Sequence, residues 1–342
     1  MNADILKKTA KQMVAPGKGI LAADESTSTV EKRLAQVNVP STEENRRAWR
    51  EVFFTAPRIG DYISGVILYD ETIRQSDSKG RPFVKILEEA GVLPGIKVDQ
   101  GLKEMDGSPL EKLTKGLDGL PGRLKEYAGL GAKFAKWRAV ITIDGDKLPS
   151  DANIRQHAKD LAAYARACQE EGIVPMVEPE VMMDGAHTME RCEEVSKKVL
   201  TAVFEELQSA GVLLEGIVLK TNMIVPGKES GQKAAPEEVA GATLRVFKEV
   251  LPAALPGEAF LSGGQAEVEA TENLNAVNKR GPHPWALTFS YGRALQGSAL
   301  KIWSGKAENV AAAQQAFLHR AKMNGLATAG KYSSEMEKER PN

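Results

Sequence analysis

Eight short apolar runs recur along the 342-residue chain, separated by longer segments in which apolar and charged residues follow a helical spacing. The runs are rich in Ile, Val and Leu and are bounded by Gly or Pro, as buried parallel strands are. We expect strands within residues 19–23, 62–68, 95–98, 134–143, 173–177, 216–219, 259–261 and 286–289.

The segments between these runs carry helix signals. Helices are expected over residues 153–171, 188–210, 236–250 and 309–324, each with a start or stop residue such as Gly172 or Pro236. Strands that alternate with helices fit either a closed barrel or an open doubly wound sheet. No Gly-x-Gly-x-x-Gly follows the first run, as a dinucleotide-binding sheet would show. We therefore predict an α/β protein, a (β/α)8 TIM barrel over residues 1–330 as a single catalytic domain, with a polar C-terminal tail at 331–342.

The overall charge excludes some classes of partner. The chain has 45 Lys and Arg against 46 Asp and Glu, so its formal net charge is −1 and nucleic-acid binding is not expected.

No apolar run reaches the ~18 residues of a membrane span, and the N-terminus has no signal-peptide core. Cys168 and Cys192 have no CxxC partner and read as free thiols, which favours the cytoplasm.

Charged residues repeatedly end the predicted strands. In TIM barrels the C-terminal strand ends and the loops after them form the active site. A single charged end is an ordinary solvated terminus, but so many around one barrel predict a catalytic centre. The charged residues at these ends are Asp24, Lys97, Lys136, Arg138, Glu178, Glu180 and Lys220.

Lys220 ends the run GIVLK. The apolar residues before it should bring its amine into a partly desolvated mouth, and cations such as Lys136 and Arg138 should further disfavour its charged form. Both effects would lower the pKa of the Lys220 amine and free it to attack a carbonyl group. An ordinary surface lysine is the alternative interpretation.

Glu178 and Glu180 lie two residues apart in VEPE and face the same side of an extended chain. Like charges this close should raise the pKa of one carboxyl, which suits proton transfer near neutral pH. Asp24 is a further candidate base, although it could instead cap a turn or helix start together with Ser26. If the fourth strand ended at Ile143, Lys136 would lie at the wrong end of the barrel, so this strand must begin near residue 132.

The turns after the seventh and eighth strands resemble the usual phosphate site of barrels. They contain Ser262-Gly263-Gly264 and Gly292-Arg293, in which backbone N–H groups and a guanidinium could bind phosphate oxygens. Lys97 and Arg33 could hold a second phosphate across the mouth. The four histidines have no metal-pair spacing, so no catalytic metal is expected.

Several unusual strings, in the right order over nearly the whole chain, resemble class I fructose-bisphosphate aldolases. They are GKGILAADEST (17–27), TEENRRAWR (42–50), GIKVD (95–99), AKWRAV (135–140), VPMVEPEV (174–181), LEGIVLKTNM (214–223), FLSGGQ (260–265) and LTFSYGRALQ (287–296). The resemblance implies a lyase that reversibly cleaves fructose 1,6-bisphosphate to dihydroxyacetone phosphate and glyceraldehyde 3-phosphate, in glycolysis and gluconeogenesis. It also implies a homotetramer that uses no metal and no cofactor.

The resemblance also implies residue roles. Lys220 would form the Schiff base, Glu178 would shuttle protons during carbinolamine dehydration, and Asp24 would be the base at the carbon-four hydroxyl. Lys136 would contact the intermediates and Glu180 would support the lysine network. The carbon-one phosphate would bind at Ser262, Gly263, Gly292 and Arg293, the carbon-six phosphate near Ser26, Thr29, Arg33 and Lys97, with Arg138 also in the phosphate-binding set.

Two features depart from the family. Animal members end in a tyrosine that helps exchange protons with the enamine, whereas this sequence ends in Arg340-Pro341-Asn342 and its nearest tyrosine is Tyr332. The tail should therefore matter little for turnover. Thr221 follows the candidate nucleophile where the family more often has proline.

Three alternatives remain open on the sequence. Sedoheptulose 1,7-bisphosphate, which has the same reacting end, could be an additional substrate. A metal-dependent aldolase or isomerase would lose activity in excess chelator. A non-catalytic interaction platform would have no need of Lys220, Glu178 and Asp24 together.

Overall fold

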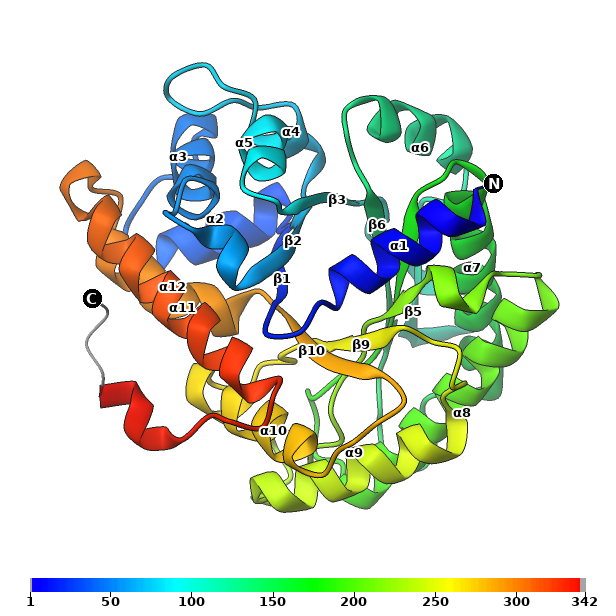
Figure 1. The fold of residues 1–342 in the computed structure, drawn as a ribbon. Coiled ribbons are helices and arrows are strands. Elements are labelled where there is room, and N and C mark those ends of the chain that lie inside the picture. Colours follow the sequence, from blue (N-terminus) through cyan, green and yellow to red (C-terminus); the bar gives the residue numbers. More distant parts are fainter. Residues whose placement is uncertain (1, 339–342) are drawn as a thin grey trace.

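The structure, a computed structural model that describes residues 2–338, is a closed barrel of eight parallel strands surrounded by helices (Figure 1). Neighbouring strands follow the chain order, and β1 closes the barrel by pairing with both β2 and β10. The strands are β1 (Gly19–Ala23), β2 (Ile63–Leu68), β3 (Leu93–Lys97), β6 (Phe134–Ile141), β7 (Val174–Val181), β8 (Val218–Leu219), β9 (Gly257–Phe260) and β10 (Ala286–Tyr291). The predicted (β/α)8 TIM barrel is confirmed.

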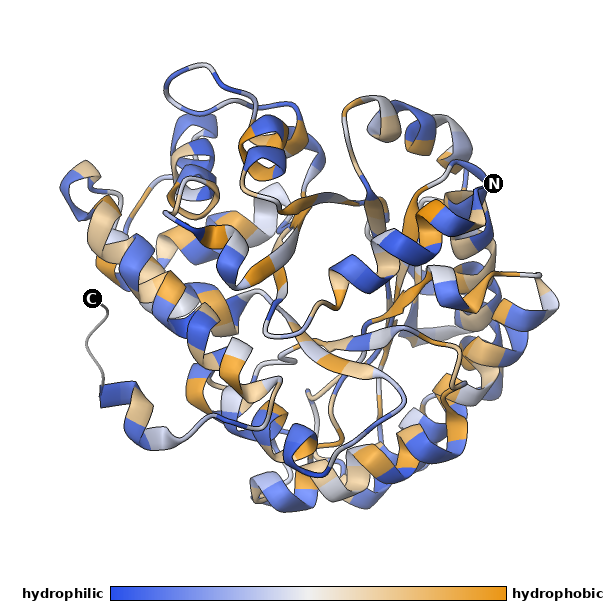
Figure 2. Cartoon of the chain, viewed as in Figure 1, coloured by the Kyte–Doolittle hydropathy of each residue, from blue (hydrophilic) through white to orange (hydrophobic). Residues whose placement is uncertain are grey.

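The helices cover the outside of the barrel and one of its ends. The predicted helices at 153–171, 188–210, 236–250 and 309–324 correspond, within three residues at each end, to α7, α8, α9 and α12. In Figure 2 the central strands are mostly hydrophobic, whereas the helices show both hydrophobic and hydrophilic residues. The helices are α1 (Ala3–Met13), α2 (Thr27–Ala35), α3 (Glu43–Phe54), α4 (Asp70–Ile73), α5 (Phe83–Glu89), α6 (Leu120–Gly129), α7 (Asp151–Glu170), α8 (Met189–Ser209), α9 (Pro236–Val250), α10 (Glu267–Lys279), α11 (Arg293–Trp303) and α12 (Val310–Ala327). No helix within residues 2–338 is long and apolar enough to cross a membrane.

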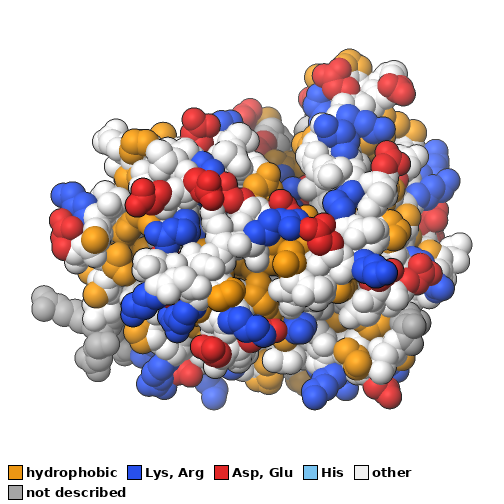
Figure 3. Space-filling model, turned by 90° about the horizontal axis from the view of Figure 1, so that it is seen from above, with side chains coloured by type: hydrophobic (Ala, Val, Ile, Leu, Met, Phe, Trp, Pro, Cys, Tyr) orange, Lys and Arg blue, Asp and Glu red, His pale blue; other side chains and the backbone are white. Residues whose placement is uncertain are grey.

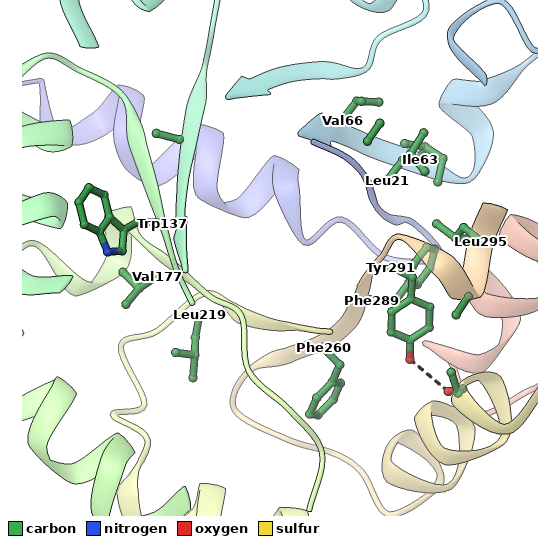
Figure 4. Close-up of a cluster of buried hydrophobic side chains, with 14 of the residues drawn as sticks. Leu21, Ile63, Val66, Trp137, Val177, Leu219, Phe260, Phe289, Tyr291 and Leu295 are labelled. Atoms are coloured by element: carbon green, nitrogen blue, oxygen red, sulfur yellow. Dashed lines mark hydrogen bonds between the residues drawn. The ribbon is translucent and has the colours of Figure 1, made fainter. Parts of the chain in front are cut away.

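The main core lies between the barrel wall and the helices. Figure 4 shows side chains such as Trp137 and Phe260 that point outward from their strands. The Trp137 ring lies 5.6 Å from that of Tyr164 on α7, and Phe260 stacks on Phe247 of α9 at the same distance. Because residues alternate along a strand, the residues on either side of Trp137 in sequence face the barrel interior.

A second, smaller core fills the amino-terminal end of the barrel. The α1 residues Leu6, Ala10 and Met13 pack there against inward-facing strand residues that include Phe134. A Cβ atom on Gly95 would lie 2.2 Å from the Phe134 ring, so only glycine leaves room for this ring. α1 crosses this end of the barrel (Figure 1), and its apolar side chains close it.

The fourth barrel strand resolves the uncertainty about Lys136. β6 begins at Phe134 and ends at Ile141, and Lys136 lies opposite Lys97, the last residue of β3. Beyond that level β6 continues only alongside β7. Lys136 therefore lies at the carboxyl end of its β3 neighbour, although it is the third residue of its own strand. Because β7 runs to Val181, well beyond the predicted 173–177, the VEPE carboxylates lie within a strand and not in a loop.

The sequence prediction omits an antiparallel hairpin between β3 and α6. It consists of β4 (Leu102–Met105) and β5 (Ser108–Thr114), joined by Asp106-Gly107. Asp-Gly between two strand-forming runs is a strong hairpin signal. The hairpin also packs on the barrel, where Thr114 donates a 2.7 Å hydrogen bond to the carbonyl of Arg138.

The tail residues that the structure describes lie against α12. The ring of Tyr332 is buried, and its hydroxyl donates to Glu337 at 2.8 Å. Arg320 on α12 binds both carboxylate oxygens of Glu337 at 2.7 Å. Residues 339–342 of the predicted tail lie outside the described residues.

Candidate active site

One cavity of about 1060 Å³ at the carboxyl end of the barrel brings all the predicted site residues together. They approach it from seven of the eight barrel strands, from the turns that follow them, or from α2. These residues are Asp24, Ser26, Thr29, Arg33, Lys97, Lys136, Arg138, Glu178, Glu180, Lys220, Ser262, Gly263, Gly292 and Arg293.

Four charged side chains form a continuous row at the bottom of this cavity. The Lys220 Nζ atom lies 3.1 Å from Glu178 Oε1, and the other Glu178 oxygen lies 3.2 Å from Lys136 Nζ. Lys136 Nζ also lies 2.8 Å from Asp24 Oδ2. The side chains of Lys220, Glu178 and Lys136 are only 4–5% exposed, so solvent screens these interactions weakly. Opposite charges thus alternate from the candidate nucleophile to the candidate base.

This row gives the two carboxyl groups low pKa values. Burial alone would raise the pKa of the Asp24 carboxyl, but the ammonium groups of Lys136 and Lys220 outweigh burial and lower it to about 2. Burial also opposes ionisation of Glu178, and the same two lysines again hold the pKa of its carboxyl below the usual value. The prediction of a raised pKa within VEPE is therefore wrong for Glu178, because the adjacent cations outweigh both burial and the Asp24 charge.

Lys136 is the shared cation of the row. Burial favours its neutral form, but the adjacent carboxylates of Asp24, Glu178 and Asp99 outweigh burial and raise the pKa of its amine. Lys136 is therefore an ammonium ion whose charge the carboxylates offset. Arg138 is paired with a carboxylate as well, so both of the cations expected near Lys220 have anionic partners.

Arg138 and Glu180 form an ion pair above the row. Arg138 binds Glu180 through Nε, and its Nη2 atom donates to the sulfur of Met182 at 3.3 Å. Both residues line the cavity, as predicted. The resemblance implies that Glu180 supports the lysine network. Among the described residues, however, its carboxylate forms an ion pair with Arg138 and with no lysine.

The turns after β9 and β10 form the first candidate phosphate site. Gly263 has φ of 59° and Gly264 has φ of 104°, conformations that favour glycine. Gly292 is the N-cap residue of α11, and Arg293 is the first residue of that helix. Two features that attract phosphate oxygens, a helix N-terminus and a guanidinium, therefore lie beside Ser262 at the cavity wall.

The second candidate phosphate site lies at the N-terminus of α2. Ser26 is the N-cap residue of this helix, and its hydroxyl lies 3.1 Å from that of Thr29. Arg33 follows one turn later on the same helix. Asp24 does not take the alternative role of a cap, because its carboxylate binds Lys136.

Lys97 differs from the other predicted phosphate ligands. Its ammonium is already bound to Asp99, at 2.7 Å to both the carboxylate and the backbone carbonyl. Asp99 also lies 4.0 Å from Lys136 Nζ, so it adjoins the four-residue row, although it is not among the predicted site residues. Its place directly after the third predicted strand, in GIKVD, was the available signal.

A buried ion pair supports the loop after β1. Arg50 from α3 reaches Glu25 at 2.7 Å, and both side chains are less than 10% exposed. Glu25 directly follows Asp24, so this pair holds the loop that carries the candidate base. The pair joins residues 25 positions apart, which no local sequence pattern indicates.

Comparisons with known proteins agree with this geometry. Residues 5–342 match the family described as fructose-bisphosphate aldolase class-I. The chain is 53% identical over 333 residues to a probable fructose-bisphosphate aldolase class 1 of Xanthomonas campestris, covering 97% of this chain and 99% of that protein. It is 54% identical over 323 residues to the cytosolic fructose-bisphosphate aldolase 4 of Arabidopsis thaliana, covering 94% and 82%.

A solved structure is similar over the same range. It is that of fructose-bisphosphate aldolase from Plasmodium falciparum in complex with TRAP and a small-molecule inhibitor, with 50% identity and a TM-score of 0.96 over 97% of this chain and 96% of that one. The family match, the identity over nearly the full length and the shared barrel show that the chain belongs to the class I fructose-bisphosphate aldolase family.

Proposed function

We propose that Lys220 is the Schiff-base lysine with which this aldolase reversibly cleaves fructose 1,6-bisphosphate to dihydroxyacetone phosphate and glyceraldehyde 3-phosphate. The observation that carries the proposal is the buried Lys220 amine, 3.1 Å from the ionised carboxylate of Glu178. A carboxylate at this distance can accept the ammonium proton and leave the neutral amine that attacks a ketone.

Formation of the Schiff base needs one proton to move twice. Glu178 takes a proton from Lys220, and the free amine attacks the carbon-two carbonyl of the substrate to give a carbinolamine. The Glu178 carboxylic acid then returns its proton to the departing hydroxyl group, which leaves as water, and an iminium ion remains. The same oxygen thus acts first as base and then as acid.

Cleavage of the carbon–carbon bond follows at the other end of the row. The Asp24 carboxylate takes the proton of the carbon-four hydroxyl, and the electrons of the bond between carbons three and four move to the iminium ion. Glyceraldehyde 3-phosphate leaves, and an enamine remains on Lys220. Protonation at carbon three and hydrolysis of the iminium ion release dihydroxyacetone phosphate and the free amine.

Lys136 serves both steps without forming a bond to carbon. Its ammonium lies between Glu178 and Asp24 and favours the ionised form of each, so both are available as bases. Arg293 and the α2 residue Arg33 would hold the two phosphates at opposite sides of the mouth. Binding at both ends would orient the reacting carbons over the row.

Borohydride reduction in the presence of dihydroxyacetone phosphate tests the proposal. Reduction of the iminium ion should leave a stable adduct, which peptide mapping should locate on Lys220. The adduct should disappear in Lys220→Met, whose melting temperature verifies that it is folded. An adduct on any other lysine contradicts the assignment.

The proposal also covers the oligomeric state, the cellular compartment and the bounds of the catalytic domain. The family resemblance supports a cytoplasmic homotetramer, with residues 1–330 as the catalytic domain and no cofactor. The subunit mass is 37.0 kDa, so light scattering should give about four times that value. Catalysis should persist in excess chelator, and a loss of activity there would support a metal-dependent mechanism.

A further inference from the structure

The strand that precedes Lys220 is the shortest in the barrel. β8 contains only Val218 and Leu219, and it pairs with β9 at a single position, Leu219 opposite Glu258. A strand this short has few ladder hydrogen bonds to fix the residues that follow it. Lys220 itself donates its backbone N–H to the carbonyl of Val177 on β7 at 2.8 Å, and contacts of the next residue add to this link.

Thr221, the residue after Lys220, supplies those contacts. Its hydroxyl donates at 2.8 Å to the carbonyl of Pro179 on β7, which lies between the two VEPE carboxylates. Its backbone N–H donates at 2.7 Å to the carboxyl group of Glu258 on β9. Its carbonyl accepts at 3.0 Å from the N–H of Leu261, which precedes Ser262. Thr221 thus joins the nucleophile to the strands on both sides.

Glu258 is an unusual partner for a backbone N–H. Its side chain is fully buried, and strand alternation with the inward-facing Ala259 directs it to the helix-facing side of the wall, as for Phe260. Its second oxygen, Oε2, has no hydrogen-bond partner among the described residues. Burial raises the pKa of this carboxyl well above its usual value, against the opposing effect of the nearby Lys220 charge.

Glu258 therefore differs from every carboxylate of the catalytic row. Those groups contact cations within 4.0 Å, whereas Glu258 has no ion pair in the part of the chain that the structure describes. An ionised carboxylate with no paired cation in such a place is strongly disfavoured. The group is accordingly a neutral acid that accepts one hydrogen bond.

We propose that Glu258 is a positioning residue: its carboxyl oxygen holds the Thr221 N–H and thereby fixes the Lys220 amine against Glu178. The proposal rests on the catalytic role proposed for Lys220. If Glu258 releases the N–H, the segment after β8 loses a hydrogen bond to a side chain of β9, and the distance between the amine and its base becomes variable. Displacements of about 1 Å in reacting groups can cost on the order of a hundredfold in rate.

Two substitutions of similar length separate this role from a merely structural one. Glu258→Gln keeps a neutral acceptor oxygen for the N–H, whereas Glu258→Met fills the space without one. We expect the Gln variant to keep kcat within about threefold of the parent. The Met variant should lose roughly 10- to 100-fold in kcat and in the rate of borohydride-trapped adduct formation, with little change in KM. Its melting temperature should fall below that of the Gln variant, because the buried Thr221 N–H is left without an acceptor, so kcat and the trapping rate are compared per folded molecule.

The outcomes distinguish the possible failures. A Met variant with parental kcat and trapping rate overturns the positioning role, while Lys220→Met continues to test the nucleophile independently. A Gln variant as impaired as the Met variant overturns the neutral-acceptor argument. If the Met variant does not fold, Glu258→Leu replaces it in the same comparison.

Removal of the donor provides a second test. In a Thr221→Pro background there is no N–H at position 221, so Glu258→Gln and Glu258→Met should give the same kcat. A remaining difference between these two double variants shows that Glu258 acts by another route and contradicts the proposal.

Discussion

The two ends of the barrel are built from the same eight strands, but one is filled with apolar side chains and the other with charged ones. At the amino-terminal end α1 buries Leu6, Ala10 and Met13 against apolar strand residues. At the carboxyl end the strands present a buried row of ammonium and carboxylate groups with Lys220 and Asp24 at its two ends. The face seen in Figure 3 shows a third environment, in which cationic and anionic side chains are interspersed.

The difference shows how the chain separates stability from chemistry. Apolar packing favours the folded state without any charge to desolvate. Burying an ion costs free energy unless an ion of opposite charge lies beside it. In the row, Lys136 is that partner for both Glu178 and Asp24. We therefore expect substitutions at the amino-terminal end to change the stability of the fold, and substitutions at the carboxyl end to change turnover.

The largest expected effect is on the carboxyl end. Glu178→Gln removes the group that takes and returns the Lys220 proton, so kcat should fall by about 10²- to 10⁴-fold. Glu180→Gln is the matched control, because this carboxylate binds Arg138 and has no ion pair with a lysine in the described structure. Steady-state kinetics should show a far smaller loss for the control. Equal losses would mean that the proton transfer does not depend on Glu178.

A substitution at the amino-terminal end should give the opposite pattern. Leu6→Ala leaves a cavity under α1 and should lower the free energy of unfolding by about 2–5 kcal/mol. The kcat per folded molecule should be unchanged. Ile5→Ala, on the exposed side of the same helix, should change stability by at most about 0.5 kcal/mol. Denaturant unfolding measures the free energy of unfolding, and steady-state kinetics at 25 °C measure kcat. A large loss of kcat in folded Leu6→Ala would contradict the separation of stability and turnover between the two ends of the barrel.

The row itself should contribute to stability in one pH range. The pKa of Asp24 is lowered from 3.8 to about 2, so the folded state binds fewer protons than the unfolded state between these values. The stabilisation is present above pH 4 and is lost as the pH falls towards 2. The stability of the parent relative to Asp24→Asn should fall by roughly 2 kcal/mol over this range. Unfolding curves at several pH values measure it, and a pH-independent difference would show that Asp24 is not held ionised.

Features that depend on local properties of the chain can be predicted from the sequence, and features that depend on contacts between strands cannot. Apolar runs that end in charge indicate both the barrel wall and the site, because strand period and strand end are local properties of the chain. The sign of the Glu178 pKa shift is not local. It depends on Lys136 and Lys220, which lie within 3.2 Å only after three strands have assembled.

Two other features were beyond prediction for the same reason. Asp99 is a single acid two residues after Lys97, and only the fold brings it to Lys136. Glu258 lies in a short run whose alternation is too brief to show which side faces the interior, and its partner Thr221 follows another strand, β8. Contacts across strands therefore required the structure, whereas the elements that make them did not.

The smallest effect on kcat is expected from the C-terminal tail, which lies at neither end of the barrel. Deletion of residues 333–342 should change kcat by no more than a few fold, because Glu337 binds Tyr332 and Arg320 and neither Tyr332 nor Glu337 lines the cavity. The deletion leaves the Arg320 guanidinium without its carboxylate, so the melting temperature should fall more clearly than kcat does. Glu337→Gln should reproduce that shift in melting temperature at full chain length. A hundredfold or greater loss of kcat on deletion would instead show that the tail supplies a group to the mouth of the barrel during turnover.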